Sequence, residues 1–122
     1  MINGINHVAL IVSKEECLDF YKKLGFKETS RMNRPEKNDV LIMMENNGAV
    51  LEVFIRPDAP LRHCKPEAYG CRHIAFDVDN VEEIIEILKD YEQQPIRTTE
   101  EGRRLVFIND SDNQPVEFLE KI

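Results

Sequence analysis

The stretch His7-Val8-Ala9-Leu10-Ile11-Val12-Ser13 returns 66 residues further along the chain as His73-Ile74-Ala75-Phe76-Asp77-Val78-Asp79. Both copies alternate with period two, which is typical of a strand with two distinct faces. His7 shares one face with Ala9 and Ile11, and His73 begins the matching face of the second copy. The repeat therefore predicts two equivalent strands, each with a histidine at its start.

A helix is predicted after each of these strands. Ser13 lies three residues before Glu16, and Asp79 lies three residues before Glu82, a spacing typical of helix N-caps. Gly25 is a suitable residue to end the first helix. Each helix has an apolar stripe that predicts packing against one face of a sheet: Cys17, Phe20, Tyr21 and Leu24 in the first, and Val81, Ile84, Ile85 and Leu88 in the second.

A hairpin follows each helix. The Asn46-Asn47-Gly48 turn favours positive φ, and Asn109 to Gln114 forms the corresponding polar turn. The predicted strands are 27–32, 40–44 and 50–54 in the first half, and 96–98, 104–108 and 115–119 in the second. We therefore expect an α+β fold in which two β-α-β-β-β repeats form a curved mixed sheet. Residues 1–122 would be one domain, with repeat one at about 1–56, a proline-containing linker at 57–70 and repeat two at about 71–122.

Glu52 and Glu117 occupy equivalent places in the two hairpins, each flanked by apolar residues. A carboxylate in the middle of an apolar strand is costly unless it is paired, protonated or coordinated. Two imidazoles and two carboxylates suit a divalent ion such as Ni²⁺, Zn²⁺, Co²⁺, Mn²⁺ or Fe²⁺. His7, Glu52, His73 and Glu117 are therefore the predicted metal ligands, converging within one chain or across two.

The composition restricts the partners of the protein. A net charge of −7 argues against nucleic acid, since phosphate binding needs clustered basic residues. No apolar run approaches the roughly 20 residues of a membrane span, and no signal segment opens the chain, so a cytoplasmic protein is expected. Three cysteines do not form a disulfide framework. A zinc site at His63, Cys64 and Cys71 is a weaker alternative because no fourth ligand has suitable spacing.

The string I-N-H-V-A-L-I-V, with F-Y-K-K-L-G-F after it, resembles the opening of the vicinal-oxygen-chelate superfamily. The strings L-E-V-F-I-R-P, G-C-R-H-I-A-F-D-V-D-N-V and R-L-V-F-I-N-D-S-D-N-Q-P-V-E-F-L-E extend the resemblance over almost the whole chain. Within that superfamily the sequence is most similar to small bacterial proteins related to lactoylglutathione lyase, that is, glyoxalase I. The usual D-P-D-G turn of the family reads Asp110-Ser111-Asp112-Asn113 here, and Asn113 can still take a positive φ.

The resemblance implies the same four ligands and one divalent ion, with Ni, Zn, Co and Mn as the candidate metals. It also implies a lyase or isomerase that transfers a proton next to a metal-bound carbonyl, with Glu117 as the better candidate for the base and Glu52 as its partner. The implied substrate is the hemithioacetal of methylglyoxal and a thiol. Glu52 departs from the two-histidine, one-glutamate set of fosfomycin resistance enzymes and extradiol dioxygenases.

Two other functions remain open from the sequence. A methylmalonyl-CoA epimerase-like isomerase is ranked second, since it would favour a hairpin loop longer than Asn109 to Gln114. A non-catalytic, resistance-type protein would bind a small molecule in the same cleft. In each case a homodimer is expected by analogy with the family. The weak candidates for contact with a substrate anion are Arg56, Arg62, Arg72, Arg103 and Arg104.

Overall fold

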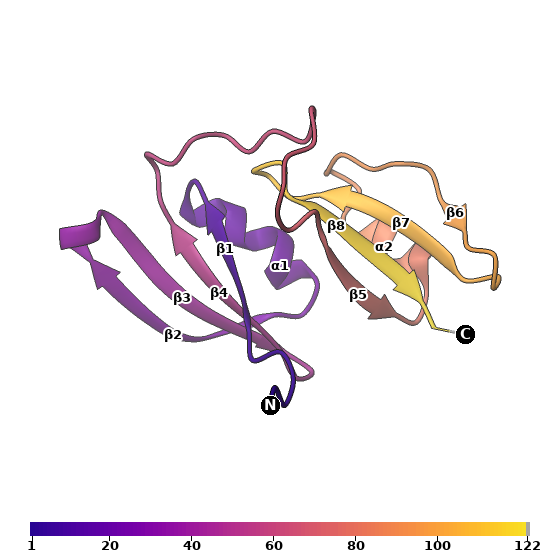
Figure 1. Cartoon of the computed structure of the whole chain (residues 1–122), viewed down its shortest axis with the longest axis horizontal. Helices are drawn as coiled ribbons and strands as arrows, with labels where there is room; N and C mark the ends of the chain where they lie inside the picture. Colours follow the sequence, from indigo (N-terminus) through magenta and orange to yellow (C-terminus); the bar gives the residue numbers. More distant parts are fainter. Residues whose placement is uncertain (122) are drawn as a thin grey trace. The chain divides into compact units, whose positions relative to one another are not determined.

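The structure is a computed structural model that describes residues 1–121. The chain forms two compact units, Met1–Pro60 and Leu61–Ile122, shown in Figure 1. The boundary between them falls inside the segment predicted as the linker, 57–70. That the two units make up a single domain remains a prediction.

Each unit repeats the order strand, helix, three strands. Unit 1 contains β1 (Val8–Val12), the 3₁₀ helix η1 (Glu15–Leu18), α1 (Asp19–Lys23), β2 (Lys27–Arg34), the 3₁₀ helix η2 (Pro35–Lys37), β3 (Asp39–Asn46) and β4 (Ala49–Ile55). Unit 2 contains β5 (Ile74–Val78), α2 (Val81–Ile87), β6 (Arg97–Thr98), β7 (Arg104–Asn109) and β8 (Pro115–Glu120).

The two sheets have the same topology. The strand orders are β1-β4-β3-β2 and β5-β8-β7-β6, and the first strand of each unit lies parallel to the last while the other pairs are antiparallel. These are two four-stranded mixed sheets, one in each unit. The predicted α+β class with two β-α-β-β-β repeats is confirmed.

One face of each sheet is buried and carries the helix of its unit. The alternation predicted for the first strand holds, since Leu10 and Val12 are buried whereas Ala9 and Ile11 are not. The buried apolar residues of unit 1 include Leu18, Phe20, Tyr21, Ile42, Met44, Leu51 and Val53, and those of unit 2 include Val81, Leu88, Val106, Ile108, Val116 and Phe118. The residues of the opposite face, such as Ala9 and Ile11 on β1, are not part of this core.

Both predicted N-caps are wrong, whereas the predicted turns are confirmed. Lys14 rather than Ser13 precedes the first helical turn, which is a 3₁₀ turn with no side-chain cap. Asn80 rather than Asp79 caps α2, because its Oδ1 accepts a hydrogen bond from the backbone N–H of Glu83 at 2.9 Å. Gly25, Asn47, Gly48 and Asn113 all have the positive φ that their turns require.

No helix among residues 1–121 combines the length and the apolar character needed to cross a bilayer.

Candidate metal centre

The four predicted ligands lie at equivalent places in the two units. His7 and His73 immediately precede β1 and β5, the strands that pair in parallel with β4 and β8. Glu52 lies on β4 and Glu117 on β8. The residues directly before and after each glutamate are buried, whereas those two positions away are only half-buried. Because side chains alternate between the two faces of a strand, each carboxylate lies on the sheet face opposite the core.

The strand register gives each glutamate two apolar neighbours. Glu52 lies opposite Ala9 on β1 and Met43 on β3. Glu117 lies opposite Ala75 on β5 and Phe107 on β7. The small alanine beside each glutamate leaves room for the side chain of the histidine that shares its face.

In unit 1, His7 Nε2 lies 3.6 Å from Glu52 Oε1. The other ring nitrogen, Nδ1, donates a hydrogen bond to Asn6 Oδ1 at 2.8 Å, because an amide oxygen can only accept. In the neutral tautomer that donates from Nδ1, Nε2 is the nitrogen with a lone pair for a metal. A hydrogen bond that fixes the second nitrogen is the usual arrangement for a histidine that binds a metal.

In unit 2, His73 Nε2 lies 3.0 Å from Glu117 Oε1. The His73 ring meets Phe107 edge to face, with 4.9 Å between the ring centroids. The Glu117 side chain is 14% exposed, against 24% for Glu52, so the second pair is the more enclosed.

The spacing within each pair fits two donors on one metal ion. Two ligand atoms bonded to the same ion at about 2.1 Å lie roughly 3.0 to 3.4 Å apart for octahedral to tetrahedral angles. The observed distances of 3.6 and 3.0 Å are close to that range. Among residues 1–121, no group of three or more histidine, cysteine, aspartate or glutamate side chains is gathered as a metal site. A four-ligand site therefore needs one pair from each unit, and it remains a prediction.

The arginines predicted as weak substrate contacts already have partners. Arg72 binds Glu67, Arg103 binds Asp77 and the backbone oxygen of Glu120, and Arg104 binds both Glu82 and Glu120. Arg56 lies 3.8 Å from Asp39, and Arg62 donates to the backbone oxygens of Cys71 and Arg72.

Two of these ion pairs also lower the pKa of the carboxylic acid involved. The hydrogen bond from Arg72 lowers the pKa of Glu67, and the one from Arg104 lowers the pKa of Glu120. The positive charge of both guanidiniums is therefore already matched within the chain.

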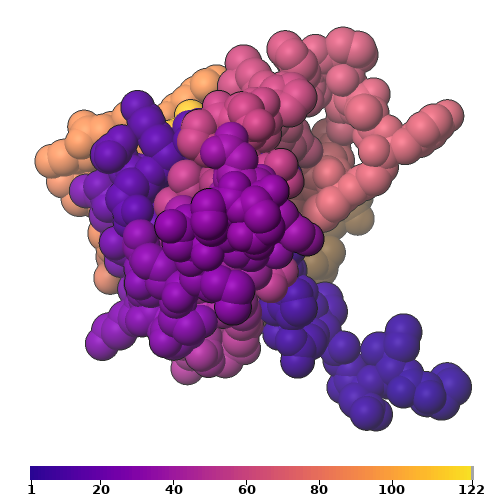
Figure 2. All heavy atoms as spheres, turned by 90° about the vertical axis from the view of Figure 1, so that its left-hand side faces the viewer, coloured from indigo at the N-terminus to yellow at the C-terminus, as the bar shows by residue number. Residues whose placement is uncertain are grey.

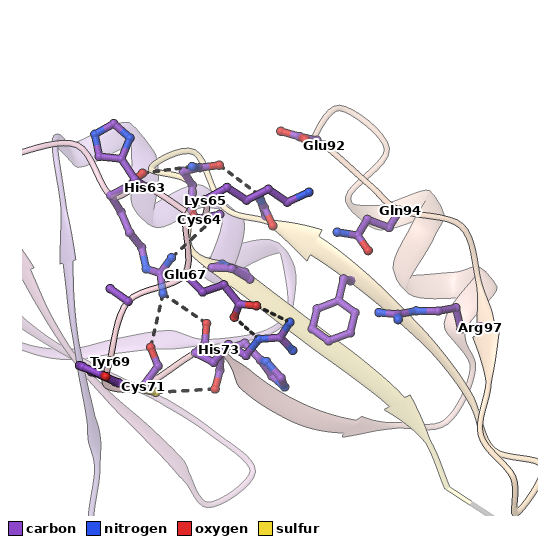
Figure 3. Close-up of a pocket in the computed structure, with 17 residues that line it drawn as sticks. His63, Cys64, Lys65, Glu67, Tyr69, Cys71, His73, Glu92, Gln94 and Arg97 are labelled. Carbon is purple, nitrogen blue, oxygen red and sulfur yellow. Dashed lines mark hydrogen bonds and ion pairs between the residues drawn. The ribbon is translucent and has the colours of Figure 1, made fainter.

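Unit 2 also contains an open cavity of about 890 Å³. Figure 3 shows residues of the segment from His63 to Cys71 on one side and Glu92, Gln94 and Arg97 on the other. His73 and Phe107 are among the lining residues, so the cavity reaches one member of the second histidine–glutamate pair.

Arg97 lines this cavity but was not among the sequence candidates. Its guanidinium carbon lies over the Phe107 ring, 5.1 Å from the centroid. The two residues are on neighbouring strands, β6 and β7, and nothing in the sequence pattern links them. Only the strand pairing reveals the contact.

The alternative zinc site gains no support. The Cys64 thiol donates to the backbone oxygen of Asn113 at 3.3 Å, and the Cys71 thiol lies 3.7 Å from the backbone oxygen of His73. Neither thiol belongs to a group of metal-binding side chains within the described residues.

Comparison with known proteins places these features in context. The family profile described as Glyoxalase/Bleomycin resistance protein/Dioxygenase superfamily matches residues 4–118. The chain is 37% identical to Uncharacterized protein YwkD of Bacillus subtilis (strain 168), with 99% of both sequences covered. The crystal structure of a glyoxalase family protein from Enterococcus faecalis is 36% identical, with a TM-score of 0.87 and coverage of 97% of this chain and 98% of that chain.

A more distant structure shares the fold. The E126Q mutant of the fosfomycin resistance protein FosX from Listeria monocytogenes, in complex with Mn(II) and 1S,2S-dihydroxypropylphosphonic acid, is 22% identical. Its TM-score is 0.77, with 97% of this chain and 92% of that chain covered.

Proposed function

Because the chain belongs to the Glyoxalase/Bleomycin resistance protein/Dioxygenase superfamily, we propose that it is a divalent-metal-dependent, glyoxalase-like lyase. The observation that carries the proposal is the recurrence of one histidine–glutamate pair at the same place in both units. A single pair of this kind on a sheet is an ordinary polar contact. Two equivalent pairs, each spaced for a shared ion, favour a metal centre.

His7, Glu52, His73 and Glu117 would hold the ion. Imidazole and carboxylate ligands suit Ni²⁺, Zn²⁺, Co²⁺ or Mn²⁺. The Mn(II) complex of FosX supports a divalent ion in this fold. When bound, the ion supplies a Lewis acid that polarises the oxygens of the substrate and lowers the cost of negative charge on them.

Glu117 is the residue we assign as the base. Its side chain is half-buried beside Ala75 and Phe107, where few waters compete for its oxygens. The carboxylate would take the proton from the carbon that bears sulfur in the hemithioacetal of methylglyoxal and return it to the neighbouring carbonyl carbon, while the hydroxyl proton passes to the former carbonyl oxygen. The product is a lactoyl thioester with the same atoms as the substrate, so no other reactant is needed.

Glu52 would be the pseudo-symmetric partner of Glu117. Its side chain is more exposed and lies close to His7, whose ring is fixed by Asn6. This position suits a group that holds the ion and orients the substrate while Glu117 moves the proton.

The short turn between β7 and β8 supports a lyase over an epimerase. Asp110 Oδ1 accepts hydrogen bonds from the backbone N–H groups of Asp112 and Gln114, both at 2.9 Å. A turn closed in this way leaves little room for the longer loop that we associate with an epimerase.

The test is turnover of the methylglyoxal–glutathione hemithioacetal by protein loaded with Ni²⁺ or Zn²⁺, followed by the absorbance of the thioester. Glu117→Gln keeps the size of the side chain but removes the base, and we expect kcat to fall by at least about 100-fold. Glu45→Gln is the matched control, because Glu45 is an exposed carboxylate on β3. Full activity in E117Q would contradict the assigned roles, and inactivity of the wild-type protein with every metal would contradict the lyase.

A further inference from the structure

The segment 62–72 lies along the cavity of unit 2 and leads directly into His73 (Figure 3). It contains no helix or strand, and among the described residues no backbone–backbone hydrogen bond of a turn or loop involves it. Side chains therefore determine its conformation. It is the last stretch of chain before β5, so its path sets the position from which His73 reaches Glu117.

Arg62 holds the two ends of this segment together. Its Nη2 donates to the backbone oxygens of Cys71 and Arg72, at 3.4 and 3.2 Å, and its Nη1 lies 3.6 Å from the sulfur of Cys64. A guanidinium is planar and has several N–H donors in fixed directions, so one side chain can hold all three groups at once. A surface segment whose ends are joined in this way is an Ω-loop. The carbonyls that Arg62 binds belong to the two residues directly before His73.

The first end of this Ω-loop is anchored on the turn between β7 and β8. The Asn113 side chain donates to the backbone oxygen of Arg62 at 3.1 Å, and the Cys64 thiol donates to the backbone oxygen of Asn113 at 3.3 Å. Asn113 is held in turn by a hydrogen bond of 3.1 Å from the side chain of Asn109, the last residue of β7. Arg62 therefore connects a fixed point of the sheet to the backbone that carries His73.

The ring of His73 lacks the side-chain support that His7 has. The His7 ring is fixed through Nδ1, which donates to Asn6. Among residues 1–121, no hydrogen bond involves His73 Nδ1, and the contacts of the ring are those with Glu117 and Phe107. A histidine that binds a metal usually has a hydrogen bond on its second nitrogen, which holds the ring. In unit 2 the backbone before His73 is the part of the residue that is held instead.

From these contacts we propose that Arg62 is a positioning residue of the candidate metal centre. It touches neither Glu117 nor the His73 ring, and it acts by fixing the backbone immediately before His73. This role rests on the proposed function, because it presupposes that His73 binds the ion. Without Arg62 the Ω-loop would be attached at Asn113 alone, and His73 Nε2 would lose its fixed distance of 3.0 Å from Glu117 Oε1.

The first arm of the test uses metal-free protein and NMR spectroscopy. In the wild type, the Arg62 Nη–H signals should be separate and sharp, because the hydrogen bonds block rotation about the Nε–Cζ bond. Arg62→Gln, with a shorter side chain, should shift the His73 ring signals and weaken the nuclear Overhauser effects between the His73 and Phe107 rings. Those between Phe76 and Phe118, whose ring centroids lie 6.1 Å apart, should stay and show that the sheet is intact.

Two further variants make this arm specific. Arg62→Lys keeps a charged donor without the planar fork and should restore the His73 ring signals in part. Glu67→Gln breaks the exposed ion pair with Arg72 inside the same Ω-loop and should leave those signals as in the wild type. Averaged Arg62 Nη–H signals in the wild type, which need no variant to measure, or unchanged His73 ring signals in R62Q would overturn the role of Arg62.

The second arm separates this role from the proposed function. The affinity for Ni²⁺ is measured by competition with a chromophoric chelator. We expect R62Q to bind Ni²⁺ about tenfold more weakly than the wild type, R62K to recover part of the affinity, and E67Q to match the wild type. Equal affinity of R62Q and the wild type would overturn the role of Arg62 and leave the metal centre standing. A wild type that binds no Ni²⁺, with the His73 ring displaced in metal-free R62Q, would contradict the metal centre but support Arg62 as the residue that positions His73.

Discussion

At the scale of single residues, the two histidine–glutamate pairs are equivalent in position but not in surroundings. Glu117 is more enclosed than Glu52, and its histidine packs on an aromatic ring, whereas His7 relies on Asn6. Repetition in the sequence predicted all four residues, because alternation in a strand fixes which residues share a face. It did not indicate this asymmetry, which depends on the neighbouring strands.

The contact between Arg97 and Phe107 could not be predicted from the sequence. Of the arginines proposed from the sequence, Arg72, Arg103 and Arg104 have carboxylate partners in the structure. The partner of Arg97 is Phe107, ten positions later on another strand. The sequence pattern does not indicate that Arg97 has no ion pair among residues 1–121, because that depends on every carboxylate within reach.

The ion pair between Asp39 and Arg34 should make the stability of the fold depend on pH in the acidic range. Its buried carboxylate accepts two hydrogen bonds from Arg34, at 2.7 and 2.8 Å, and Arg56 adds a second positive charge. The hydrogen bonds from Arg34 lower the pKa of Asp39 below its ordinary value of 3.8, although burial opposes the shift. A lowered pKa in the folded state means that the pair stabilises the fold above pH 3.8 and that this stabilisation is lost as the pH falls through the lowered value.

Asp39→Asn should therefore lower the Tm at neutral pH. The difference from the wild type should shrink below pH 3.8, where the wild-type carboxyl also becomes neutral. Thermal unfolding followed from pH 7 to pH 2 measures this directly. A difference in Tm that stays constant over that range would show that the charge of Asp39 does not matter.

At the scale of elements, the strands were predictable because more and less buried residues alternate along them. Each predicted strand lies within a few residues of the observed one, and the predicted alternation appears in the first strand, where Leu10 and Val12 are buried. The helix starts were not predictable to the residue. Asp79 and Asn80 are both good capping residues, and which of them caps depends on the backbone path that leaves β5.

The N-terminus of α2 gives a matched pair of mutations. Asn80→Ala removes the acceptor for the Glu83 N–H and should lower the free energy of unfolding by about 1 kcal/mol. Asp79→Ala, at the neighbouring exposed position, should cost less because no capping hydrogen bond is lost. Urea unfolding of the two variants is the measurement, and a larger loss for D79A than for N80A would contradict the observed cap.

At the scale of the whole molecule, the chain consists of two units with the same topology. The sequence predicted this because its repeat spans strand, helix and hairpin together, and the observed boundary after Pro60 lies in the predicted linker. Whether the two pairs share one ion cannot be predicted from the sequence, because it depends on contacts between units or between chains. Local sequence patterns do not encode such contacts.

The N-terminal segment supports the proposal of a homodimer. Met1, Ile2 and Ile5 are apolar yet 118%, 90% and 88% exposed, and Figure 2 shows this indigo segment projecting from the body of its unit. A second copy of the chain is the partner we propose for it. Light scattering at micromolar concentration should give twice the chain mass of 14.2 kDa. Deletion of residues 1–5 should weaken the dimer, and a mass of 14.2 kDa for the intact chain at all concentrations would contradict it.

Metal stoichiometry tests most directly whether one pair from each unit binds a shared divalent ion, as we propose. Protein stripped of metal is reloaded with Ni²⁺, freed of excess by gel filtration and analysed for metal per chain. We predict one ion per chain in the wild type and in Glu45→Gln. Glu52→Gln in unit 1 and Glu117→Gln in unit 2 should each weaken binding by more than about 100-fold, since a direct ligand is lost. Two ions per chain, or full retention of metal when either glutamate is replaced, would contradict a single site built from both pairs.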